Sequence, residues 1–239
     1  MRELDTTFQS KFDLGFSGFD GNAVLSGELY ASEFGLPIEL RAYSGIWLAF
    51  KRAIDLAGSL LMIAAGLIPG LLIAAAVALT SGGPVFYREE RIGRGGRPFC
   101  IWKFRSMRNV RNASTGNLLQ WRVNKKGRDP RITAVGGFLR RWSLDELPQV
   151  LNVLRGEMSL VGPRPVVAAE VPFYGHLQHL YLAAKPGLSG LWQVSGRSDV
   201  DFARRASLDA YYVRNWSLFS DLRILVRTVP AVLGRVGAR

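Results

Sequence analysis

The longest apolar stretch of the chain predicts a membrane element. No residue from Leu56 to Tyr87 is charged, and this run of 32 residues consists mainly of Leu, Ile, Ala, Val and Met. A buried helix of a soluble protein seldom needs so many apolar residues, whereas about 20 suffice to cross a bilayer. Pro69 and Gly70 interrupt the run, because proline removes a helical hydrogen bond and glycine relaxes the backbone. A kinked helix that spans the membrane is the simplest interpretation.

The charges on the two flanks favour a different topology. Both flanks of the apolar run are positive, and positive residues prefer the cytoplasmic side of a membrane. We therefore expect a re-entrant helix-break-helix over residues 46–82 that enters one leaflet and returns, with its bend at Pro69. The flanking cations are Arg41, Lys51 and Arg52 before the run and Arg88, Arg91, Arg94 and Arg97 after it.

A second hydrophobic pattern predicts a short helix that carries two carboxylates. Apolar residues between Leu147 and Leu154 recur at the spacing of one buried helix face, and Gly156 supplies a stop. Asp145 and Glu146 then fall in the first turn, where the helix dipole favours ionised carboxylates, so we expect Asp145 to be an anion at neutral pH. The spacing of Ser143 and Glu146 is also that of a capping box, which would give these residues a purely structural role.

The remaining patterns predict an α/β fold that is mainly helical. Aromatic and β-branched residues on both sides of a glycine turn predict a β-hairpin over residues 84–105. Lys103 and Arg105 share one face of its second strand, which either points at phosphate or is a solvated cationic strand. We also expect helices over residues 167–184, 202–212 and 216–236. The last is interleaved with arginines, so it either lies in the membrane interface or packs on a core.

Composition and charge restrict the partners of the chain. Lys and Arg number 31 against 19 Asp and Glu, a net charge of +12. Residues 1–45 hold seven acids and three bases, show no sustained period and predict a variable, mobile tail. The rest of the chain is strongly basic, which favours nucleic acid, anionic lipid or phosphorylated metabolites. The single cysteine, Cys100, excludes an internal disulfide and is expected to be buried on a strand.

Arginines accompany the two carboxylates along the sequence. Arg140 and Arg141 precede the pair, and Arg164 follows between two prolines that would hold it in a rigid extended turn. Guanidinium groups match phosphate oxygens, and two carboxylates can hold a divalent cation. Carboxylates and arginines beside apolar segments therefore suit a diphosphate substrate.

Seven motifs in order resemble the bacterial sugar transferase family, the monotopic polyprenyl-phosphate hexose-1-phosphate transferases that initiate exopolysaccharide, O-antigen or glycan assembly. The resemblance covers about residues 46–235, and its specificity comes from the order of the motifs. One departure is Ile68, where the family often has serine before the hairpin proline. The motifs are Lys51-Arg52-x-x-Asp55, Gly83-Pro84-Val85, Lys103-Phe104-Arg105-Ser106-Met107, Ser143-Leu144-Asp145-Glu146-Leu147-Pro148-Gln149, Ser159-Leu160-Val161-Gly162-Pro163-Arg164-Pro165, Lys185-Pro186-Gly187 and Asp209-x-Tyr211-Tyr212.

The resemblance implies an activity and assigns roles by position. Such enzymes transfer hexose 1-phosphate from a UDP-sugar to undecaprenyl phosphate, release UMP and need Mg²⁺. The family's nucleophile falls on Asp145, which would form a covalent phosphosugar intermediate, and its magnesium-binding carboxylate falls on Glu146, so that both flank the metal. The positions expected to hold phosphate and other parts of the substrate fall on Lys103, Arg140 and Arg164, with Arg105, Arg141 and Arg197 as further candidates.

The same resemblance sets the expected partners and location. We expect a UDP-sugar, undecaprenyl phosphate and the phospholipid bilayer as partners, without nucleic acid, and a homodimer stays open. The loop over residues 192–197 resembles members that use glucose or galactose. The protein would lie at the bacterial cytoplasmic membrane, with a catalytic domain over residues 83–239 on the cytoplasmic face. Two alternatives are a non-catalytic membrane-anchored basic module that binds anionic lipid or nucleic acid, and a subunit that anchors other assembly proteins.

Overall fold

The fold is mainly helical with two small sheets, which confirms the expected α/β class. The structure, a computed structural model, describes residues 45–108, 129, 131–196 and 201–234, so the tail predicted before residue 45 lies outside the described residues. The elements, with 3₁₀ helices marked η, are α4 (Ile46–Ser81), β1 (Phe86–Ile92), η2 (Arg94–Gly96), β2 (Pro98–Phe104), α6 (Ala134–Arg141), η4 (Leu144–Gln149), α7 (Val150–Arg155), β3 (Ser159–Val161), η5 (Ala168–Leu177), α8 (Gln178–Ala183), β4 (Gly187–Ser189), α9 (Leu191–Val194), α10 (Phe202–Arg214) and α11 (Leu218–Leu233).

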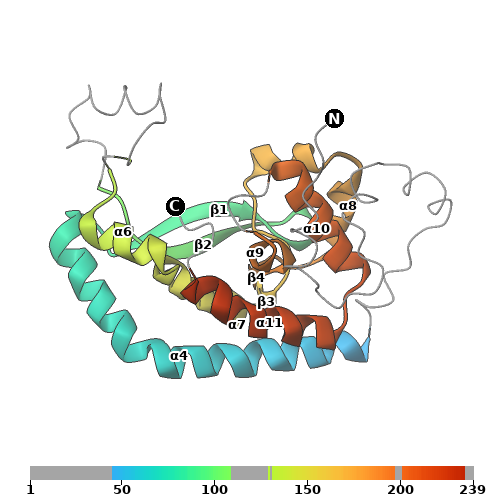
Figure 1. Ribbon diagram of the computed structural model, residues 1–239, viewed down its shortest axis with the longest axis horizontal. Helices are drawn as coiled ribbons and strands as arrows, with labels where there is room; N and C mark the ends of the chain where they lie inside the picture. The colour runs from blue at the N-terminus through green and yellow to red at the C-terminus, as the bar shows by residue number, and fades with distance from the viewer. Residues whose placement is uncertain (1–44, 109–128, 130, 197–200, 235–239) are drawn as a thin grey trace. The chain divides into compact units, whose positions relative to one another are not determined.

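Helix α4 is the apolar segment predicted from the sequence. Among the described residues it is the helix long and apolar enough to cross a membrane, and most of its apolar surface is open: Leu61, Ile68 and Leu79 are 71 %, 71 % and 87 % exposed. The helix continues through Pro69 without a gap, and its ribbon changes direction partway along its length (Figure 1). The break predicted at Pro69 was therefore wrong, because the α-helix stays continuous there and only bends, and the re-entrant topology stays a prediction.

Both halves of α4 contact the same body of protein. In the first half, the Asp55 carboxylate accepts hydrogen bonds from the Ser159 hydroxyl at 2.9 Å and from the Leu160 N–H at 2.8 Å, both in β3. In the second half, Val77 is buried in an apolar cluster with side chains of β2 and α6. These contacts lie on opposite sides of Pro69 along the helix. The two ends of α4 are thus attached to one body.

The β-hairpin forms as predicted. Strands β1 and β2 pair antiparallel, with Tyr87 opposite Lys103, and glycines at positive φ close the turn between them. Cys100 lies on β2 but is exposed, so the prediction that it is buried was wrong. Successive side chains of a strand point to opposite faces. Ile101 takes the inward position and is only 1 % exposed, so its neighbour Cys100 points outward.

The second sheet was not predicted. Strands β3 and β4 pair in parallel through Ser159–Gly187 and Val161–Ser189, and each strand has only three residues. Such short strands show no alternation of apolar and polar residues that the sequence could reveal. The single helix expected over residues 167–184 is instead divided into η5 and α8, because Gly175 has a non-helical backbone with φ 52° and ψ −128°.

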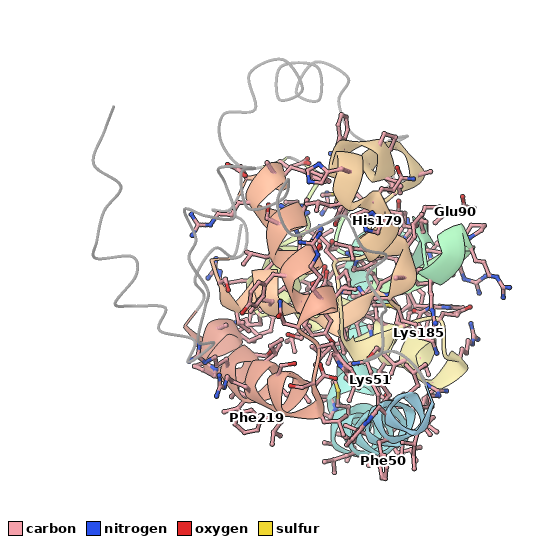
Figure 2. All side chains as sticks on the ribbon, turned by 90° about the vertical axis from the view of Figure 1, so that its right-hand side faces the viewer. Phe50, Lys51, Glu90, His179, Lys185 and Phe219 are labelled. Atoms are coloured by element: carbon pink, nitrogen blue, oxygen red, sulfur yellow. The ribbon has the colours of Figure 1, made fainter. Side chains whose placement is uncertain are left out.

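A buried ion pair joins the start of α4 to α11. The Lys51 ammonium donates to the Asp221 carboxylate at 2.6 Å and to the Val161 carbonyl at 3.0 Å. The Tyr212 hydroxyl donates to the same carboxylate at 2.7 Å, and the Trp216 indole N–H does so at 3.1 Å. Figure 2 shows Lys51 turned from α4 toward the neighbouring helices. The buried ammonium of Lys51 and the buried carboxylate of Asp221 therefore neutralise each other inside the protein.

Removing one member of this pair should be strongly destabilising. The Lys51→Met substitution leaves the Asp221 carboxylate buried without its counter-ion, which should lower the free energy of unfolding by about 3 kcal/mol. Chemical denaturation in detergent would measure the loss. The double substitution Lys51→Met with Asp221→Leu should recover a large part of it, because no lone charge is then buried. A loss of less than about 0.5 kcal/mol in the single variant would contradict this account.

Candidate active site

A cavity of about 1020 Å³ lies beside the predicted carboxylates, and its lining has two characters. One part is polar and charged, and it comes from β2, α6, η4 and the turn after β3. The other part is apolar, and α11 contributes several of its residues whereas α4 contributes Met62. The charged lining includes Lys103, Arg105, Arg140, Asp145, Glu146 and Arg164, whereas the apolar lining includes Met62, Leu160, Leu225, Val229 and Val232. Segments far apart in the sequence thus surround one space.

The two carboxylates lie in the first turn of η4, as the pattern predicted, but the capping box does not form. Ser143 precedes the turn with φ 56°, and its side chain makes no capping hydrogen bond. Glu146 does not reach back to Ser143 and instead pairs with the Lys103 ammonium at 3.1 Å. Ser143 is the one non-glycine residue with positive φ among those described, and it lines the cavity. Backbone strain of this kind is concentrated at functional sites.

The environment of Asp145 makes its carboxyl group a weaker acid than usual. Burial and, to a smaller extent, the nearby charge of Glu146 together raise the pKa of Asp145 to about 6, although Lys103 and Arg140 oppose the shift. The helix dipole was expected to favour the ionised form of Asp145, but the loss of water around the half-buried carboxylate outweighs it. A single 3₁₀ turn has only a small dipole. At neutral pH the group is still mainly ionised, so it can act as a nucleophile.

The carboxylate pair could supply two oxygen ligands to a magnesium ion. Oxygen ligands suit Mg²⁺, and the mutual repulsion that raises the pKa of Asp145 would be relieved by a cation between the two groups. The described residues contain no cluster of three or more His, Cys, Asp or Glu side chains that could hold a metal. Magnesium commonly takes its remaining ligands from substrate phosphate and water, so two carboxylates are compatible with such a site.

Arg164 is held at the edge of the cavity by contacts on two sides. Its backbone N–H lies 3.4 Å from the carboxylate of Asp209, which also accepts a hydrogen bond from the Tyr174 hydroxyl at 2.8 Å. Its guanidinium lies over the Trp192 ring at 4.8 Å, and Arg205 lies over the same ring at 4.9 Å. The Nε of Arg164 and the indole N–H of Trp192 are buried without a hydrogen-bond partner. Both donors could therefore serve a bound ligand.

The structure brings most of the predicted cations together. Lys103, Arg105, Arg140 and Arg164 line the cavity, although the Nε of Arg105 already donates to the Pro84 carbonyl at 2.7 Å. Arg141 is exposed and is not part of the cavity lining. Arg197 lies outside the described residues. Sequence reasoning did not single out Arg108, Arg131, Trp142, Gln193 or the apolar residues of α11 as lining residues.

The histidines are not arranged as a metal site. His176 lies in η5 and His179 in α8, and both are exposed. Neither lines the cavity.

The chain is similar to known proteins over most of its length. Residues 46–235 match the family described as bacterial sugar transferase. The exopolysaccharide production protein ExoY of Rhizobium meliloti is 46 % identical over 213 residues, which cover 84 % of this chain and 93 % of that protein. The undecaprenyl-phosphate galactose phosphotransferase of Salmonella typhimurium is 50 % identical over 166 residues, 66 % of this chain and 35 % of that protein.

A third relative is similar over a comparable part of the chain. The UDP-glucose:undecaprenyl-phosphate glucose-1-phosphate transferase of Escherichia coli is 41 % identical over 204 residues, which cover 81 % of this chain and 42 % of that protein. The family match covers well over half of the chain and contains every described residue that lines the cavity. This chain therefore belongs to the bacterial sugar transferase family.

Proposed function

We propose that the chain transfers hexose 1-phosphate from UDP-glucose or UDP-galactose to undecaprenyl phosphate and releases UMP, as the first membrane step of exopolysaccharide or related glycan synthesis. Its family makes it a phosphoglycosyl transferase. The observation that carries the proposal is the single cavity that joins paired carboxylates and cations to an apolar wall. A water-soluble diphosphate and a lipid phosphate could both reach Asp145 there.

The donor would bind by its diphosphate at the charged end of the cavity. Lys103, Arg140 and Arg164 approach this space from three different elements, so they could contact phosphate oxygens from several directions. Arg164 is preorganised by its contacts with Trp192 and Asp209, which reduces the entropy lost when a substrate binds. The galactose and glucose named in the relatives make a hexose the preferred donor sugar.

Asp145 would perform the first displacement. One carboxylate oxygen attacks the β-phosphorus, and a new oxygen–phosphorus bond forms as the bond from that phosphorus to the bridging oxygen breaks. The bridging oxygen keeps the electron pair and leaves on UMP, so no proton transfer is required. Magnesium held by Asp145 and Glu146 would offset the negative charge of the diphosphate, which otherwise repels an anionic nucleophile.

The lipid phosphate would complete the reaction in a second displacement. After UMP leaves, an oxygen of undecaprenyl phosphate attacks the same phosphorus, and the Asp145 carboxylate departs with its electron pair. The chain then returns to its starting state with a lipid diphosphate sugar as product. Lys103 would remain close to Glu146 throughout, which keeps that carboxylate oriented toward the site.

The position of the apolar surfaces supports a re-entrant placement in one leaflet. Phe50 of α4 and Phe219 of α11 are 51 % and 65 % exposed and lie along the same lower edge of the molecule in Figure 2. A helix that crossed the bilayer would carry its far end about 30 Å away from the body. In α4, however, both ends contact that body. We propose that the body lies on the cytoplasmic face of the bacterial inner membrane.

Replacing the nucleophile should abolish the first displacement without disturbing the fold. Asp145→Asn should reduce UMP release from UDP-sugar by at least about 1000-fold, because the amide is not nucleophilic, while donor binding is retained. Intact-protein mass spectrometry of the wild type should show the phosphosugar adduct, and Asp145→Asn should lack it. Glu90→Gln, an exposed change on β1, is the matched control and should behave as the wild type. Turnover by Asp145→Asn close to wild type would refute the assignment.

The rate of the first displacement should depend on pH through Asp145. Because burial raises the pKa of this carboxyl group to about 6, the group gains a proton and loses its reactivity as the pH falls through that value. The kcat/KM for the UDP-sugar should be level above about pH 7 and fall about tenfold per pH unit well below 6. Thermal melting at each pH would show that the protein stays folded. A level profile down to about pH 5 would contradict the role of Asp145.

The proposed topology can be tested by labelling single cysteines. In a Cys100→Ser background, Arg41→Cys and Glu90→Cys place one thiol before and one after the apolar helix. A membrane-impermeant maleimide should label both only after the inner membrane of the cells is permeabilised, because both flanks are cytoplasmic. Labelling of Arg41→Cys alone in cells with an intact inner membrane would show a spanning helix instead.

A further inference from the structure

We infer that the apolar side of the cavity binds the first isoprenoid units of the lipid acceptor and thereby directs its phosphate to Asp145. This inference rests on the proposed function and assigns a place to one of its two substrates. We call this surface the tail wall. It consists of Met62 from α4 and Leu225, Val229 and Val232 from α11.

The tail wall is one face of α11. Leu225, Thr228, Val229 and Val232 line the cavity, and their spacing of three, four and seven residues is that of a single helix face. Thr228 is the polar member of this face, but its hydroxyl donates to the Ile224 carbonyl at 2.8 Å and contacts the Ser189 hydroxyl at 2.5 Å. Its polar group is therefore satisfied within the protein, so the face presents a mainly apolar surface to the cavity.

A neighbouring set of apolar residues on α11 is exposed and does not line the cavity. Phe219, Leu222 and Val226 are 65 %, 59 % and 63 % exposed, and none of them lines the cavity. The helix also packs on the protein through Ile224, which is only 1 % exposed. Beyond this packing, the exposed residues suit the surrounding bilayer, and the residues that line the cavity can contact a molecule inside it.

Val229 marks the place where these two surfaces meet. It lines the cavity and is also 58 % exposed, so it lies at a mouth of the cavity on the apolar side. Met62 of α4 also lines the cavity, and the two residues before it, Leu60 and Leu61, are exposed. An isoprenoid chain could therefore pass from the bilayer into the cavity without leaving apolar surroundings.

The two substrates differ in polarity, and only the lipid acceptor has an apolar part that matches the tail wall. A UDP-sugar carries hydroxyls, a diphosphate and a polar base, and it gains little from an apolar surface. The lipid acceptor has an anionic head and a hydrocarbon tail, which match the cations at one end of the cavity and the tail wall at the other. Charge complementarity and continuity with the bilayer thus point to the acceptor.

The experiment separates the two displacements of the reaction. In purified protein, UMP released from UDP-sugar without acceptor reports the first displacement, and the KM for undecaprenyl phosphate reports the acceptor. Val229→Asn should raise that KM roughly tenfold while the UMP burst stays at the wild-type amount. A prenyl phosphate of two isoprene units, which contacts less of the wall, should show a smaller increase. Val229→Leu, which keeps the wall apolar, should have a KM close to wild type.

The matched control is Val226→Asn on the same helix. Val226 is exposed to a similar extent, 63 % against 58 % for Val229, but it does not line the cavity. Its substitution should change the KM for undecaprenyl phosphate less than twofold. An unchanged KM in Val229→Asn, an equal increase in both asparagine variants, or loss of the UMP burst in Val229→Asn would overturn the inference. Absence of a UMP burst in the wild type would instead reject the proposed function.

Discussion

The attachment of both ends of one apolar helix to the same body is the constraint on which the arrangement of this protein depends. Near its start, α4 is held by the buried pair of Lys51 and Asp221 and by the contacts of Asp55 with β3. Beyond Pro69, Val77 is buried against β2 and α6. A helix held in this way keeps the cavity beside the apolar surface that would meet lipid. Chemistry on a membrane-bound substrate requires that proximity.

Within the cavity, the balance of burial and charge determines the properties of the carboxylates. Loss of water and the repulsion between Asp145 and Glu146 disfavour two anions, while Lys103 and Arg140 stabilise them. The result is a carboxylate at Asp145 that is ionised near neutral pH but less strongly solvated than a surface aspartate. The strained Ser143 backbone directly before Asp145 is consistent with a site whose geometry is maintained by its surroundings.

Much of the fold could be predicted from local sequence patterns. The predictions that failed did so for physical reasons. The hairpin, α10 and α11 follow from strand alternation, glycine turns and helical spacing. The parallel pair of β3 and β4 could not be predicted, because three-residue strands carry no periodic signal. The capping box was a reasonable alternative for Ser143 and Glu146, but the backbone of Ser143 and the partner of Glu146 depend on residues distant in sequence.

The apolar segment, its positive flanks, the carboxylate pair and the family resemblance could all be read from the linear chain, because length, charge and motif order are properties of the amino-acid sequence. The three-dimensional fold was needed to show which cations line the cavity with the carboxylates, how far burial raises the pKa of Asp145, and that α11 supplies an apolar wall to the same cavity. These properties depend on loss of water and on contacts between segments far apart in the chain. Short-range patterns of residues do not contain that information.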